Sequence, residues 1–182
     1  TTGTAFLGQT AGSYSVAVNY TGSPTADGVV ALSYNAVDQV TPIGDTAGAD
    51  STSGTNPSVS IDVNSEYSLV VGGVSFRGGD TGPFTPGTGT TERYDFASGA
   101  HSIHDDSYAG GEEGHDVTGT YTFDFTSSLT NAWAIAAVVL RPIANAQVTT
   151  QAATSITSSG ATLNGNITDI GSSNVTVRGF DY

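Results

Sequence analysis

Alternation of apolar and polar positions predicts β-strands along much of the chain. Residues 13–20 alternate most cleanly, with two tyrosines and two valines on one face. Residues 29–37 and 131–142 are more continuous apolar runs, which are typical of inner strands. Shorter strands are expected at 58–63, 66–76, 91–96 and 117–125. No segment keeps a 3.6-residue apolar period, so we predict an all-β fold.

The segments between these strands are polar and long. Residues 41–57, 77–90 and 101–116 are rich in turn-forming residues and are expected to be loops. About seven strands with such loops are typical of a two-sheet, jelly-roll-like β-sandwich. Within 66–76, the pair Gly72-Gly73 indicates a β-bulge or close backbone packing.

The same reading divides the chain into three parts. Residues 1–142 are expected to form the sandwich domain, and residues 143–151 a linker. Residues 152–182 are expected to form a short, partial β unit of fibronectin or immunoglobulin type, or a donor-strand segment.

Composition narrows the possible partners. The 182 residues include 27 Thr, 21 Ser and 24 Gly, no Lys and four Arg, with a net charge of −13. An acidic chain without a basic stripe repels phosphate backbones, so nucleic-acid binding is not expected. Membrane insertion is not expected either, because no apolar run approaches about 20 residues. The negative charge favours divalent cations.

The absence of Cys and Met adds a second constraint. Without Cys the fold has neither disulfides nor thiol chemistry, and residue 1 is not a translation start. Low charge and high Thr and Ser content suit an extracellular, cell-surface or virion-surface protein. Sequons at Asn19, Asn166 and Asn174 are candidate glycosylation sites in that setting.

One segment concentrates candidate metal ligands. Residues 101–116, HSIHDDSYAGGEEGHD, contain all three histidines of the chain among acidic residues. Oxygen ligands between Gly turns suit Ca²⁺, whereas imidazoles favour Zn²⁺. The spacing matches no established metal motif, and a solvated acidic loop is the alternative interpretation. The candidate ligands are His101, His104, Asp105, Asp106, Glu112, Glu113 and Asp116.

No motif specifies a reaction, so we expect no enzyme. A glycosidase needs two carboxylates that face each other across a cleft about 5–9 Å wide. Candidate acids lie in or near the predicted strands but form no evident pair: Asp62, Glu66, Asp95 and Asp124. No GxSxG elbow occurs. Trp133 is expected in the core, and Tyr108 is the better exposed candidate for stacking on a sugar.

Three stretches carry a resemblance to a known domain. Residues 29–44 read VVALSYNAVDQVTPIG, residues 90–99 read TTERYDFASG, and residues 132–142 read AWAIAAVVLRP. They resemble the SYxGVDQxTP, QTxRWD and WAIxAVxIRP segments of a jelly-roll sandwich domain common in large bacterial, archaeal and phage surface proteins. The resemblance spans residues 10–142 and implies a sandwich fold.

The end of the chain resembles a second domain. Residues 147–182, and especially the string ATLNGNITDIGSSNVTVRGFDY, resemble the first strands of a fibronectin type III-like repeat. Such a repeat has more strands after the position of Tyr182, and the sandwich family has more before residue 10. The resemblance therefore implies that the first domain lacks its beginning and the second its end.

Two interpretations of these unfinished domains are open. The chain is an internal fragment of a longer protein, or copies complete one another by donor-strand complementation. The second interpretation predicts a head-to-tail homopolymer. Residues 1–8 and 146–182 are the candidate donor segments. Val175, Val177 and Phe180 are the side chains expected to fill the acceptor groove.

The leading functional hypothesis is a non-enzymatic structural subunit of an extracellular or virion-associated fibre. Its copies are expected to assemble by edge-strand pairing or strand exchange. The alternative is a carbohydrate-binding module or adhesin that recognises glycans through a loop-borne Ca²⁺ site. A hydrolase is a third hypothesis and needs an inward-facing acid pair.

Overall fold

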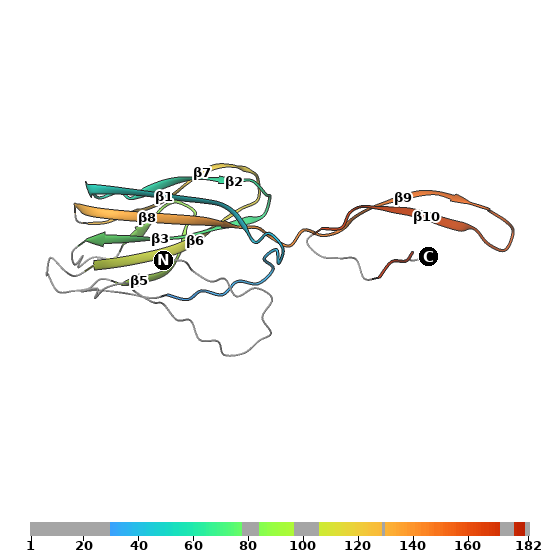
Figure 1. The fold of residues 1–182 in the computed structure, drawn as a ribbon, viewed down its shortest axis with the longest axis horizontal. Coiled ribbons are helices and arrows are strands. Elements are labelled where there is room, and N and C mark those ends of the chain that lie inside the picture. Colours follow the sequence, from blue (N-terminus) through green and yellow to red (C-terminus); the bar gives the residue numbers. More distant parts are fainter. Residues whose placement is uncertain (1–29, 78–83, 97–105, 129, 172–176, 181–182) are drawn as a thin grey trace.

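The computed structural model describes residues 30–77, 84–96, 106–128, 130–171 and 177–180. Within these ranges every regular element is a strand, so the predicted all-β fold is confirmed (Figure 1). In the same ranges no helix is long and apolar enough to cross a membrane. The strands are β1 (Ile43–Gly54), β2 (Ser58–Val63), β3 (Ser68–Arg77), β4 (Thr85–Pro86), β5 (Thr91–Phe96), β6 (Asp106–His115), β7 (Gly119–Thr126), β8 (Asn131–Leu140), β9 (Gln147–Thr154) and β10 (Thr162–Asp169).

The strands form two packed sheets and a separate hairpin. A five-stranded sheet has the order β1-β8-β3-β6-β5, and a three-stranded sheet has the order β2-β7-β4. All pairs are antiparallel. The two sheets face each other as a sandwich, and the β9–β10 hairpin extends from one end of it (Figure 1). The predicted two-sheet sandwich is therefore confirmed.

Strict alternation builds the core between the sheets. In β2 every second residue is buried, and in β7 Phe123 and Phe125 are buried without exposed surface. These side chains meet the buried positions of β3 and β8, such as Val70 and Val139. Hydrophobic burial of these alternate residues holds the layers together.

Close packing explains the glycine pair in β3. A Cβ at Gly72 would lie 2.5 Å from Cε1 of Phe123, so the glycine makes room for that ring. On the opposite face, a Cβ at Gly73 would lie 2.5 Å from the Tyr94 hydroxyl. The β3 register runs without a shift against both neighbours, so the glycines serve close packing and form no bulge.

Two predicted loops are strands, and this is a correction. Residues 41–57 contain β1, an edge strand whose Ala47 and Ala49 pack against the core. Residues 106–115 of the expected acidic loop form β6, which pairs with both β3 and β5. Both are poor in β-forming residues, so their neighbours impose the extended conformation.

The expected inner strand at 29–37 is wrong for residues 30–37. These residues form no ladder except a single bridge between Val37 and Pro142. We call residues 30–42 the strap. Its end is fixed at the sandwich exit, because Asp38 N donates to Arg141 O and Ile143 N donates to Ala36 O. The strand predicted at 13–20 lies outside the described residues.

The Asp38 side chain shapes the turn within the strap. Its carboxylate accepts hydrogen bonds from Val40 N at 2.7 Å and Thr41 N at 3.0 Å. Ala36, two residues earlier, has φ of 57°. A left-handed backbone favours glycine, so alanine at this position carries some backbone strain.

Candidate functional site

The β9–β10 hairpin has one apolar and one polar face. Val148 pairs with Ile167, and Thr150 pairs with Gly165, so these four positions share a face with Leu163. The opposite face carries polar pairs, Thr149 with Asn166 and Gln151 with Asn164. β9 begins at Gln147, so residues 147–151 of the expected linker belong to this hairpin.

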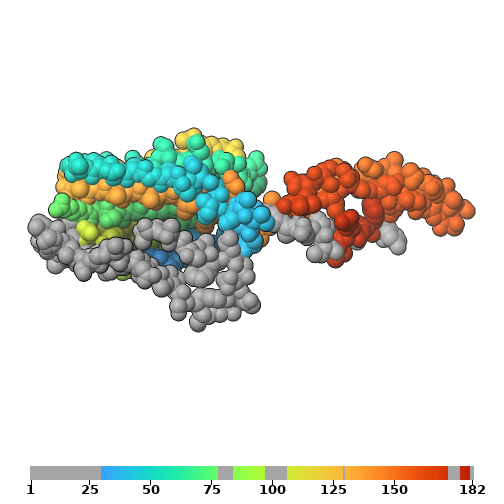
Figure 2. All heavy atoms as spheres, in the orientation of Figure 1, coloured from blue at the N-terminus to red at the C-terminus, as the bar shows by residue number. Residues whose placement is uncertain are grey.

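The apolar face is largely uncovered. Val148 is 69% exposed and Leu163 is 43% exposed, and no described residue of β9 or β10 is buried. Figure 2 shows the hairpin as a narrow arm beyond the end of the sandwich. An isolated two-stranded hairpin is at best marginally stable in water, so β9 and β10 gain little stability from each other alone.

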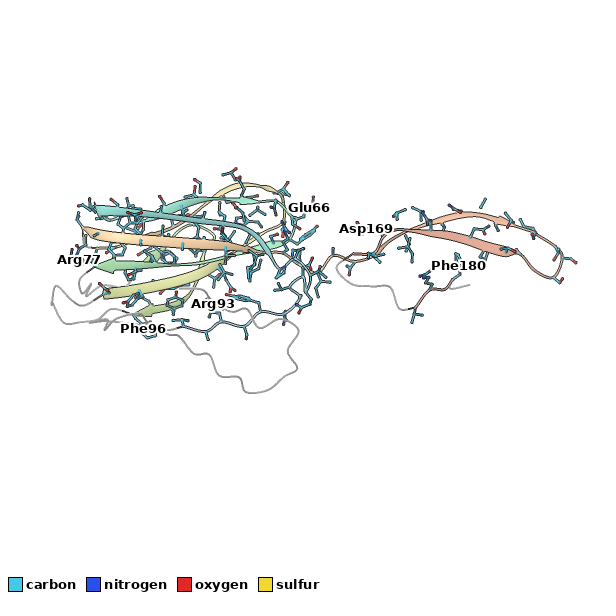
Figure 3. The ribbon with its side chains drawn as sticks, viewed as in Figure 1. Glu66, Arg77, Arg93, Phe96, Asp169 and Phe180 are labelled. Atoms are coloured by element: carbon cyan, nitrogen blue, oxygen red, sulfur yellow. The ribbon has the colours of Figure 1, made fainter. Side chains whose placement is uncertain are left out.

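One aromatic side chain approaches the hairpin. A Cβ at Gly165 would lie 3.2 Å from Cζ of Phe180, so this ring packs over the glycine. Figure 3 shows Phe180 beneath β10. The ring still keeps 43% of its surface exposed, and Val177 is 84% exposed. Val175, the third side chain predicted for strand exchange, lies outside the described residues.

A second apolar surface, open among the described residues, lies on the sandwich. Residues 71 and 136 of β3 and β8 point away from the three-stranded sheet, and we call that side the outer face. An open groove of about 560 Å³ runs along it, beside the start of the strap. Its lining includes the side chains Val30, Leu32, Val71, Tyr94, Ala136 and Val138.

Small residues form the floor of the groove. Gly48, Ala136, Gly73 and Gly110 lie side by side across β1, β8, β3 and β6. The Tyr94 ring covers Gly110 and reaches Gly73, because its atoms occupy the space that a Cβ would take there. Beyond Tyr94, over Ala136 and Gly48, the small residues floor the open groove.

A charged pair lies on the outer face beside the strap. Glu112 of β6 forms an ion pair with Arg93, and the Tyr34 hydroxyl lies beside the same carboxylate. Burial is the main cause that raises the pKa of Tyr34 to about 12, and the Glu112 carboxylate adds to the effect. Arg93 lowers the pKa of Glu112. Figure 3 shows where Arg93 lies relative to β5 and β6.

The next residue, Glu113, lies on the other face of β6. Its carboxylate is 3.6 Å from Nε2 of His115, whose ring lies 3.7 Å from that of Tyr121 between ring centres. Burial raises the pKa of Glu113, and the nearby Asp124 carboxylate adds to the effect. Neighbouring glutamates therefore have opposite environments, because successive residues of a strand face opposite ways.

The predicted metal ligands do not come together in the described part. Glu112 and Glu113 diverge to opposite faces, Asp116 is exposed, and Asp106 begins β6. Among the described residues no group of three or more His, Asp or Glu could hold a metal ion. His101, His104 and Asp105 lie outside the described residues, so the Ca²⁺ site stays a prediction.

Two of the four acids considered for catalysis make structural hydrogen bonds. Asp62 accepts a bond of 2.6 Å from the Thr120 hydroxyl, and Asp95 accepts one of 2.8 Å from Phe84 N. Glu66 is exposed. Asp124, expected to face solvent, is half-buried and packs against Gly87 of the β4–β5 turn.

The aromatic and glycosylation candidates fall in different places. Trp133 is half-buried and packs against the core, in the role expected for it. Tyr108 lies half-buried in β6, not in an exposed loop. Asn166 is exposed on the polar face of the hairpin, which leaves its sequon accessible. Asn19 and Asn174 lie outside the described residues.

Sequence reasoning missed the outer-face groove and the Tyr34–Glu112 contact. One signal was available, because the outward positions of β8, Ala134, Ala136 and Val138, are all apolar. A solvent-facing side of an antiparallel sheet is ordinarily polar, so this run indicated a surface with a cover. Comparison with known proteins adds no further indication: no family model, curated protein or solved structure matches the chain.

Proposed function

We propose that the protein is a non-enzymatic structural subunit of an extracellular or virion-associated fibre, and that its copies join through the β9–β10 hairpin. The observation that carries this proposal is the bare apolar face of a two-stranded hairpin. The hairpin also has two free ladder edges, since no third strand of the described chain pairs with it. Such edges pair readily with another chain.

Charge favours the hairpin as the contact. The chain carries a net charge of −13, so close approach of two copies is opposed by repulsion over most of the surface. Residues 143–171 contain a single charged residue, Asp169. The hairpin is therefore the part of the chain that approaches an acidic neighbour with the least electrostatic cost.

Sedimentation velocity and negative-stain microscopy of the whole chain, over a range of concentrations, test this function. We expect self-association, and we expect Val148→Asp to weaken it at least tenfold because a charge enters the apolar face. The matched control, Thr149→Asp, places the same charge on the polar face and should leave association unchanged. A chain that stays monomeric at all concentrations, or that assembles equally well with Val148→Asp, contradicts the proposal.

A further inference from the structure

We propose that the outer-face groove is the acceptor for the apolar face of the β9–β10 hairpin of a second copy. This inference rests on the proposed function, because it names the surface that the hairpin binds. Both surfaces are apolar and open in the described structure, and both belong to the same chain. A contact between them is heterologous, so each bound copy leaves a free groove and a free hairpin.

The shapes of the two surfaces correspond. The groove floor crosses β1, β8 and β3, and strands lie about 4.8 Å apart, so the floor is about 10 Å wide. Measured the same way, a two-stranded ribbon is about 5 Å wide, so it fits within the floor. Small residues at positions 48 and 136 let another sheet approach closely. Tyr94 and the start of the strap also line the groove.

The chemistry of the two surfaces also corresponds. None of the residues that line the groove is charged. The hairpin offers Val148, Leu163 and Ile167 on one face, and within residues 147–169 the single charged residue is Asp169 at its base. Arg178, two residues before Phe180, is the cation in the segment that follows. Each surface therefore loses apolar contact with water when they meet, and neither has to bury an unpaired charge.

The position of the hairpin points to a second copy as its source. Figures 1 and 2 show the hairpin extending along the long axis, beyond one end of its own sandwich. The hairpin follows residues 141–143, which are hydrogen-bonded to the strap, and extends outward from there. A neighbour placed along that axis presents its groove to the hairpin, whereas the chain's own groove lies behind it.

The absence of cysteine allows a direct test in the whole chain. Ala136→Cys places a thiol on the groove floor, and Leu163→Cys places one on the apolar face of the hairpin. When the two variants are mixed and mildly oxidised, we expect a disulfide-linked heterodimer as the main product. Thr149→Cys, on the polar face, is the matched control and should give at least fivefold less heterodimer with Ala136→Cys.

A charge exchange covers the case in which a thiol variant fails to fold. Ala136 and Leu163 are both exposed, so Ala136→Arg and Leu163→Asp should keep the sandwich intact by circular dichroism. Each alone should weaken association at least tenfold, and mixing the two should restore a dimer. Restoration upon mixing requires that the two positions meet across the interface.

The outcomes separate the two proposals. Self-association of the unaltered chain without cross-linking or charge rescue overturns the groove as acceptor and leaves the fibre subunit standing. Absence of self-association contradicts both. A thiol at position 136 that stays protected from a small maleimide in monomeric protein also overturns the inference, because the chain then covers its own groove.

Discussion

The sandwich and the hairpin are made of similar residues but differ in whether they enclose an interior. In the sandwich, alternate positions of β2, β3, β7 and β8 meet across two sheets and are almost fully buried. In the hairpin, the same alternation produces an apolar face on which, among the described residues, the ring of Phe180 packs in part. Alternation therefore specifies which face is apolar, and a second sheet decides whether that face becomes a core.

The largest expected difference is in amide hydrogen exchange. Amides of β3 and β8 should exchange only through global unfolding, which typically requires about 5–15 kcal/mol. Amides of β9 and β10 should exchange within a factor of about 100 of the unfolded chain in dilute protein, since the hairpin alone is marginal. Exchange measured by mass spectrometry at low concentration checks this. Equal protection of the two regions contradicts the comparison.

The second-largest expected difference between the sandwich and the hairpin is the stability that each loses when an apolar side chain is truncated. Phe123→Ala removes a fully buried ring and should lower the free energy of unfolding by about 3–5 kcal/mol. Val148→Ala removes methyl groups that are already exposed and should change it by less than about 0.5 kcal/mol. Urea denaturation of dilute protein measures both. A large loss with Val148→Ala would show that the monomer already covers the hairpin.

A smaller effect is expected within the sandwich, from the charge of Glu113 and its influence on the melting temperature. The folded pKa of Glu113 is raised, so its stability contribution is present at low pH and is lost as pH rises through that pKa. Glu113→Gln should therefore raise the melting temperature at pH 7, and the gain should shrink as pH approaches 4.

The neighbouring Glu112 is the control of opposite sign. Its folded pKa is lowered by Arg93, so its contribution is present above the unfolded pKa and disappears as pH falls. Glu112→Gln should lower the melting temperature at pH 7 and have little effect at pH 3. Melting curves between pH 3 and pH 7 that show the same trend for both variants contradict the assigned environments.

The smallest expected effect concerns the strap at the base of the hairpin. Ala36 has a left-handed backbone, so Ala36→Gly removes strain but adds flexibility to the unfolded chain. The net gain should be about 0.5 kcal/mol. Ala134→Gly, in the extended β8, should instead lose about 0.5–1 kcal/mol. Chemical denaturation resolves the two, and a loss with Ala36→Gly contradicts the strain.

The sequence predicted the strands whose own residues alternate or form apolar runs. Residues 58–63, 91–96 and 131–142 correspond closely to β2, β5 and β8. It failed for β1 and β6, where Gly, Ser and acidic residues dominate. In β6, Gly110 and Gly111 lie opposite Gly73 and Gly72, so their role depends on Tyr94 and on strand pairing. Such long-range contacts leave no local signal.

The candidate site was predictable to a similar extent. Phe180 was expected to fill the acceptor groove of another copy, and that role stays a prediction, whereas the structure places its ring against the chain's own hairpin. The metal hypothesis relied on a loop, and β6 separates Glu112 from Glu113 by placing them on opposite faces. The groove could not be predicted because it depends on residues 30–37 lying outside the sheet. The apolar run at 29–37 had instead predicted an inner strand.

The attachment of the hairpin to β8 has a mechanical consequence. Tension applied to the hairpin passes through residues 141–146 into the end of β8, along the axis of that strand. β8 lies between β1 and β3, and both ladders run along nearly its whole length. The load is therefore shared by many backbone hydrogen bonds in shear, and they cannot break one after another as in an unzipping hairpin. The strap bonds at Arg141 and Ile143 add further resistance where the force enters.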